Sequence, residues 1–143
     1  MIGILMATHE DLGSSLLKSA RLIVGEQEDV RTLSLGRGDD IQEFKEKVGQ
    51  AIKELREASD VLVLTDLFGG SPSNAAACNL EQYQFRCLSG VNLPMLLEAL
   101  LSRNTDHMNI DRLAEKCLDS GREGIKDIGG GLRTRQNGGT ANL

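Results

Sequence analysis

The stretch VLVLTDLFGGSPSN, residues 61–74, decides the fold. It begins with an unbroken apolar run, Val61 to Leu64, which is typical of a strand buried on both faces. A glycine-rich loop follows, and Ser71-Pro72 then predicts a helix start, with serine as the N-cap and proline at the first helical position. A strand, a loop and a helix in this order are the repeating unit of an α/β domain.

The same alternation continues on both sides of this stretch. Short apolar runs predict further strands, and apolar residues at three- and four-residue steps predict helices. Because strands and helices alternate, we predict a doubly wound α/β fold with a mainly parallel sheet and helices on both faces. The predicted strands are 2–7, 30–35, 61–64, 85–88 and a short final strand at 124–128, and the predicted helices are 12–24, 41–55, 73–80, 94–101 and 111–120, the last closed by Gly121.

Length and composition limit the function classes. The chain has 143 residues and a net charge of −5 without a basic cluster, which argues against a nucleic-acid partner. Its three cysteines form no CxxC pair, so we predict buried free thiols rather than a zinc site or a disulfide framework. No signal peptide is recognisable and no apolar run approaches the roughly 20 residues of a membrane span, so we expect a soluble, cytoplasmic protein.

The chain is predicted to be one domain with a tail. Residues 1–128 carry the strand and helix patterns. Residues 129–143 are rich in Gly, Thr and Asn with almost no apolar content, and we predict that this tail is disordered.

Two strand ends carry side chains that can do chemistry. His9 follows the first predicted strand, and Asp66 follows the third. If these strands are neighbours, both side chains face one crevice beyond the sheet. A carboxylate that accepts the imidazole N–H fixes the tautomer, leaves the other nitrogen free to attack and favours a positive charge on the ring.

The loop after Asp66 is suited to an anion. Gly69-Gly70 lets the backbone approach a ligand closely, and the Ser71 hydroxyl lies at a helix N-terminus. Together these features predict a histidine that carries a phosphoryl group, although the spacing alone also fits a module that binds a small anion. The chain has no GxxxxGK[ST] loop and no acidic cluster with metal spacing, so we expect no nucleotide, cofactor or metal.

Four segments together resemble a known family. They are MIGILMATHEDLGSSLL, VLVLTDLFGGSPSNAA, LSGVNLPMLLEAL and SGREGIK, which occur in this order within residues 1–128. The chain resembles the IIA component of the mannose family of the bacterial phosphoenolpyruvate:sugar phosphotransferase system (PTS). The resemblance implies a doubly wound parallel sheet and a homodimer in which a last strand is exchanged, a role that 124–128 would fill.

The resemblance also implies a phosphotransferase activity with defined partners. A phosphoryl group passes from phospho-HPr to His9 and then to the IIB component, which serves the membrane components IIC and IID in sugar uptake. It assigns Asp66 as the partner of His9, and Thr65, Gly69, Gly70 and Ser71 as phosphate-binding positions. Some relatives carry IIA and IIB in one chain; here we expect a separate IIB. Which sugar is carried is not encoded in this chain.

Other functions fit the same motifs. One is the HPr-dependent phosphotransfer subunit of a dihydroxyacetone kinase, whose first domain is similar. Another is a non-catalytic regulatory or anion-binding module. The second histidine, His107, lies in a polar connection between predicted helices and is expected to be solvated.

Overall fold

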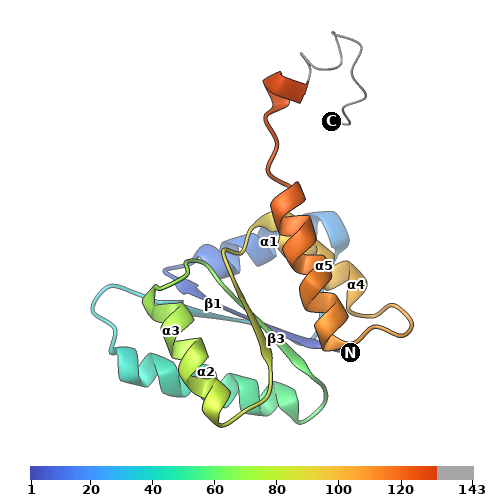
Figure 1. Ribbon diagram of the computed structural model, residues 1–143. Coiled ribbons are helices and arrows are strands. Elements are labelled where there is room, and N and C mark those ends of the chain that lie inside the picture. Colours follow the sequence, from blue (N-terminus) through green and yellow to red (C-terminus); the bar gives the residue numbers. More distant parts are fainter. Residues whose placement is uncertain (132–143) are drawn as a thin grey trace.

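Strands and helices alternate along the chain in the computed structural model, which describes residues 1–131 (Figure 1). The strands are β1 (Gly3–His9), β2 (Val30–Leu35), β3 (Val61–Thr65) and β4 (Arg86–Ser89). The helices are α1 (Leu12–Val24), α2 (Ile41–Arg56), α3 (Ser71–Cys78), α4 (Leu93–Ser102) and α5 (Ile110–Glu123), with a short 3₁₀ helix, η1 (Asn79–Glu81), after α3.

The four strands form one parallel sheet in the order β2-β1-β3-β4. Helices α1, α4 and α5 cover one face, and α2 and α3 cover the other (Figure 1). The predicted doubly wound α/β fold is therefore confirmed. β1 and β3 are neighbours, with Ala7 opposite Thr65, so both strands end at the same edge of the sheet.

The two central strands divide the core between the two faces. Successive side chains of a strand point to opposite faces, and nearly all of these are buried. The continuous apolar runs follow from this, because each side chain meets a helical layer wherever it points. The side toward α1, α4 and α5 receives Ile4, Met6, Leu62 and Leu64, and the side toward α2 and α3 receives Leu5, Ala7, Val61 and Val63.

Two predicted helix boundaries were wrong. Gly121 does not end α5, which continues to Glu123. It is buried inside the helix, where an added Cβ would lie 3.0 Å from Met95 Cε of α4, so close helix packing explains the glycine. Ser71 is not the N-cap of α3 but its first residue, because Gly70 takes the extended N-cap conformation.

The predicted final strand at 124–128 does not form within the chain. Gly124 closes α5, the next three residues have no regular structure, and 128–131 make a helical turn that leads away from the domain (Figure 1). Ile125 and Ile128 are 76% and 69% exposed. The first residues of the predicted tail thus belong to a helical turn, and 132–143 lie outside the described residues.

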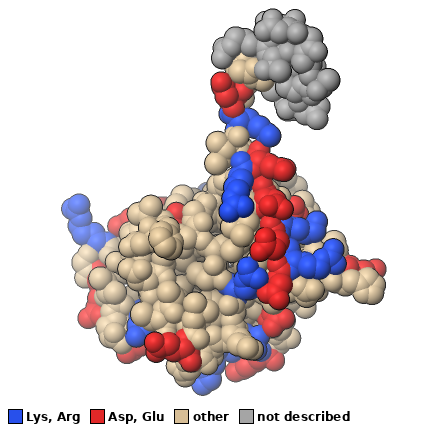
Figure 2. All heavy atoms as spheres, viewed as in Figure 1, with Lys and Arg blue, Asp and Glu red and all other residues tan. Residues whose placement is uncertain are grey.

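The cysteines and the surface bear on two further expectations, the burial of the thiols and the absence of a membrane span. Of the three thiols predicted to be buried, only that of Cys117 is, and burial raises its pKa to about 12. Cys87 is half-buried, and Cys78 on α3 is exposed. Within residues 1–131, no helix is both long and apolar enough to span a bilayer. Figure 2 shows charges of both signs gathered along α5, beside a largely uncharged face.

Candidate active site

His9 and Asp66 meet where β1 and β3 end. His9 Nδ1 lies 2.9 Å from Asp66 Oδ2, and the same oxygen accepts the His9 backbone N–H at 3.0 Å. A carboxylate only accepts, so Nδ1 carries the proton and Nε2 carries the lone pair. The His9 side chain is 44% exposed while that of Asp66 is 10% exposed. The pair therefore presents a nucleophilic nitrogen to the surface and keeps its carboxylate behind it.

The turn after β1 fixes the position of the imidazole. Glu10 has φ 46°, and its N–H donates to the Leu35 carbonyl at the end of β2. The Glu10 carboxylate accepts the Arg37 N–H at 3.1 Å, which joins the turns after β1 and β2. Gly13 N–H donates to the buried Thr8 hydroxyl at 2.9 Å, which brings the start of α1 against the strand. These hydrogen bonds fix the backbone before and after His9, and so limit where its imidazole can lie.

The glycine loop lies directly against the imidazole. A Cβ added at Gly70 would lie 2.9 Å from His9 Cε1, so the ring can occupy this place only beside a glycine. Gly69 has φ 83°, a conformation that favours glycine. The Gly70 N–H donates to the Leu67 carbonyl at 3.1 Å, so this amide closes the turn. Gly70 contributes the space for the ring rather than a free donor.

The other predicted phosphate-binding residues lie at different depths. Ser71 is half-buried at the first turn of α3, close to the loop that contacts His9. Thr65 is fully buried, and its hydroxyl bonds to the Ser73 hydroxyl at 2.6 Å. Ser73 and its neighbour Ser89 were not among the residues predicted from the sequence. A signal was available, since Thr65 and Ser89 are paired polar residues at the ends of β3 and β4.

The surface beside the site is apolar. Phe68 is 90% exposed and Leu67 is 59% exposed, in the loop that carries Asp66. A groove of about 270 Å³ adjoins them, with Ser73 and Ser89 on its polar side. Apolar side chains exposed around a reactive group are typical of a surface that contacts a protein partner.

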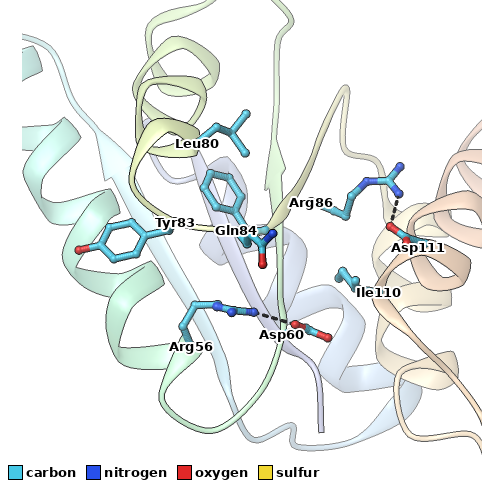
Figure 3. A pocket seen from close by; sticks show the side chains of 9 residues that line it. Arg56, Asp60, Leu80, Tyr83, Gln84, Arg86, Ile110 and Asp111 are labelled. Carbon is cyan, nitrogen blue, oxygen red and sulfur yellow. Dashed lines mark hydrogen bonds and ion pairs between the residues drawn. The ribbon is translucent and has the colours of Figure 1, made fainter.

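A second hollow lies at the opposite end of β4. It has a volume of about 390 Å³ and lies between η1 and α5, flanked by the ion pairs Arg56–Asp60 and Arg86–Asp111 at 2.7 and 2.8 Å (Figure 3). None of the predicted site residues lines it. The His9–Asp66 pair is therefore on the rim formed by the carboxyl ends of the strands, where ligands bind in a parallel α/β sheet.

The sequence matches the family described as PTS system fructose IIA component over residues 3–118. The chain belongs to this family of mannose-type IIA components. It is 36% identical over 128 residues to the PTS system mannose-specific EIIAB component of Escherichia coli K12, covering 89% of this chain and 39% of that protein. It is 39% identical over 104 residues to the PTS system fructose-specific EIIA component of Bacillus subtilis, covering 72% of this chain and 71% of the relative.

Solved structures agree with this IIA assignment. A phosphotransferase system component EIIA from Streptococcus agalactiae superposes with a TM-score of 0.78 at 34% identity, covering 90% of this chain and 98% of that one. A PTS IIA protein associated with a fucose utilization operon in Streptococcus pneumoniae gives a TM-score of 0.80 at 34% identity, covering 91% and 95%. The resemblance stated from the sequence is confirmed, while the chain spans only 39% of the length of the E. coli protein.

Proposed function

We propose that this IIA protein carries a phosphoryl group on His9 Nε2, receives it from phospho-HPr and delivers it to a IIB component for sugar uptake. The observation that supports this most directly is the 2.9 Å contact between His9 Nδ1 and Asp66 Oδ2, beside a half-exposed ring. IIA components are the phosphotransfer proteins of the PTS, so family membership supports the same role.

The proposed phosphoryl transfer needs only the two histidine side chains and no cofactor. The Nε2 lone pair forms a bond to phosphorus as the P–N bond of the donor phosphohistidine breaks, and the donor imidazole keeps that electron pair. His9 retains the proton on Nδ1, so its phosphorylated ring is cationic and is stabilised by the Asp66 carboxylate. The reverse sequence of bond changes passes the group to a histidine or cysteine of IIB. Most of the catalytic effect then comes from positioning.

The start of α3 offers donors for the phosphoryl oxygens. The first N–H groups of a helix have no partner within the helix, so the Ser71 N–H can donate to an anion, and the hydroxyl of the half-buried Ser71 can rotate to donate beside it. Gly69 and Gly70 keep the loop backbone near the ring. We assign to Thr65 a supporting role through Ser73, since its hydroxyl is buried.

Protein partners would contact the rim around His9. Phe68, which is 90% exposed, is proposed as the apolar contact for HPr and IIB.

We also keep the homodimer as a proposal. β4 has no strand on its outer side within residues 1–131, and 124–128 of a second copy could pair there. The largely uncharged face beside α5 in Figure 2 supports such a contact.

Phosphorylation with purified components tests this function. The protein is incubated with phosphoenolpyruvate, Enzyme I and HPr, and the bound phosphate is tested for the acid lability and base stability of a phosphohistidine. Labelling is expected in the wild type and in His107→Ala, which removes the other histidine from an exposed loop. It is expected to be absent in a folded His9→Ala protein. Labelling of His9→Ala would show that another residue is the acceptor.

A further inference from the structure

Three hydroxyl groups meet below the active-site loop, where β3 and β4 end. Ser73 Oγ lies 2.6 Å from Thr65 Oγ1, 2.6 Å from the Leu67 carbonyl oxygen and 3.2 Å from Ser89 Oγ. Thr65 and Ser73 are buried, with exposed fractions of 0% and 9%. Ser73 is therefore the centre of a hydrogen-bonded cluster that joins two strands, a loop and a helix.

The chemistry of the groups fixes the direction of these hydrogen bonds. A serine hydroxyl has one proton, and a carbonyl oxygen only accepts. Ser73 must then donate its proton to the Leu67 carbonyl, and it accepts from Thr65 and Ser89. The Ser73 hydroxyl proton is therefore used in the hydrogen bond to the loop. The hydrogen bonds of the cluster all run toward the Leu67 carbonyl, which is the final acceptor.

The Leu67 carbonyl is the point where the cluster meets the active site. It also accepts the Gly70 N–H at 3.1 Å, which closes the turn from Leu67 to Gly70. Asp66 precedes this turn and holds the His9 ring through Nδ1, while Gly70 lies against His9 Cε1. A shift of this carbonyl would move both groups that fix the imidazole.

The same cluster is tied to the neighbouring loop. The Thr65 carbonyl accepts the N–H groups of Gly90 and Val91, both at 3.0 Å. The end of β3 is thus connected to the loop between β4 and α4 through Thr65, the residue that precedes Asp66. The Ser73 hydroxyl links these strand ends to the active-site turn, because it donates to the Leu67 carbonyl.

We propose that Ser73 is a positioning residue for the His9–Asp66 pair. It acts through the Leu67 carbonyl and touches neither the imidazole nor the incoming phosphoryl group. The catalytic consequence rests on the proposed phosphotransfer from HPr, but the effect on the imidazole itself does not. Without the Ser73 hydroxyl, the turn loosens, the Asp66 carboxylate no longer selects one tautomer, and fewer molecules have Nε2 ready to attack.

The test compares Ser73→Ala with Ser73→Thr and with Ser102→Ala. The threonine keeps the hydroxyl, and its extra methyl can enter the adjoining groove of about 270 Å³. Ser102 is a matched control, because its hydroxyl is also buried and hydrogen-bonded, to Glu98 on α4, away from the site. Each folded variant is measured in two ways: ¹⁵N NMR of the His9 tautomers, and kcat and KM for phospho-HPr.

For Ser73→Ala we expect the Nε2–H tautomer of His9 to become populated and kcat to fall about tenfold, because a small misplacement of reacting groups is costly. KM for phospho-HPr should change less than about twofold, since the docking surface is intact. Ser73→Thr should restore both quantities, and Ser102→Ala should leave both unchanged. Thr65→Val, which removes one donor to Ser73, should shift the tautomers in the same direction by less, and it serves if Ser73→Ala does not fold.

An unchanged tautomer ratio and unchanged kcat in folded Ser73→Ala would overturn the proposal. Equal losses in Ser73→Ala and Ser102→Ala would also overturn it, because they would indicate general destabilisation. If the wild type takes no phosphate from HPr, the proposed function fails, and the NMR comparison still decides the positioning role.

Discussion

At the amino ends of β1 and β2, the buried guanidinium of Arg103 donates to the backbone carbonyls of Ile2 and Glu28 at 3.1 and 2.6 Å. At the carboxyl ends of the same sheet, neutral hydroxyls centred on Ser73 hold a turn, and the half-exposed His9 rests on Asp66. One end uses a fixed charge to fasten the chain. The other end uses uncharged hydroxyls, and its carboxylate, Asp66, lies behind the half-exposed imidazole.

This difference separates stability from chemistry. Arginine stays protonated in proteins, so the Arg103 end keeps one charge state even though burial lowers the pKa of its guanidinium. In the proposed phosphotransfer, the His9 end changes charge when a phosphoryl group arrives and leaves. Variants at the two ends should therefore fail in different assays.

The largest loss of stability is expected for Arg103→Ala. It leaves buried carbonyls without donors, so the free energy of unfolding should fall by about 3 kcal/mol. Urea unfolding measures this loss, with Arg103→Lys expected to lie in between, since lysine lacks the planar fork. Folded Arg103→Ala should still be phosphorylated by HPr at the wild-type rate. A folded variant that loses phosphotransfer would remove the distinction between the two ends.

Asp66→Asn should give the converse result. The amide cannot support a cationic ring as the carboxylate does, so phosphotransfer should slow by roughly 10- to 100-fold. The unfolding midpoint in urea should stay close to that of the wild type, because the shape of the side chain is kept. Rapid-quench kinetics with phospho-HPr measures the rate. A wild-type rate would exclude Asp66 from the mechanism.

Gly70→Ala tests the contact between the loop and the ring. Its Cβ would meet His9 Cε1 at 2.9 Å and the Leu67 carbonyl at 3.2 Å, so the ring or the turn must move. We expect phosphotransfer to slow by about tenfold. Gly70 has φ −77°, so alanine adds no backbone strain there and the loss would come from the contact with the ring. Gly38→Ala, with open space around its Cβ position, is the control for a glycine-to-alanine change in a loop that does not touch the ring. Equal rates in both variants would mean that the ring contact is unimportant.

The smallest effect on stability is expected away from both ends of the sheet, at Glu98 of α4, which accepts a hydrogen bond from Ser120 of α5. Hydrogen bonds from Ser102 and Ser120 lower the pKa of its carboxyl below the ordinary value for glutamate. Such a group stabilises the folded state above its unfolded pKa, and this contribution is lost as the pH falls through the folded pKa. Glu98→Gln should therefore cost about 0.5 kcal/mol at pH 7, and this cost should shrink as the pH is lowered, as measured by thermal unfolding. A cost independent of pH would contradict this origin.

The contact between His9 and Asp66 could be predicted from the sequence because it follows from the strand order. His9 and Asp66 end neighbouring parallel strands, and each follows an apolar run that is readable from the sequence. Ser73 was missed because its proposed role depends on the register between Thr65 and Ser89 and on the directions of the side chains. Arg103 was missed because it reaches Ile2, 101 residues away, which no local pattern records. Gly121 was misread because helix packing, not helix ending, requires a glycine there.

The most direct test of the account is the site of phosphorylation on the imidazole. The protein is labelled with ¹⁵N-histidine, phosphorylated through Enzyme I and HPr, and examined by NMR before and after transfer. The account predicts phosphorus bonded to His9 Nε2, with the proton kept on Nδ1 beside Asp66. Phosphorus on His9 Nδ1, or on any other residue, would contradict it.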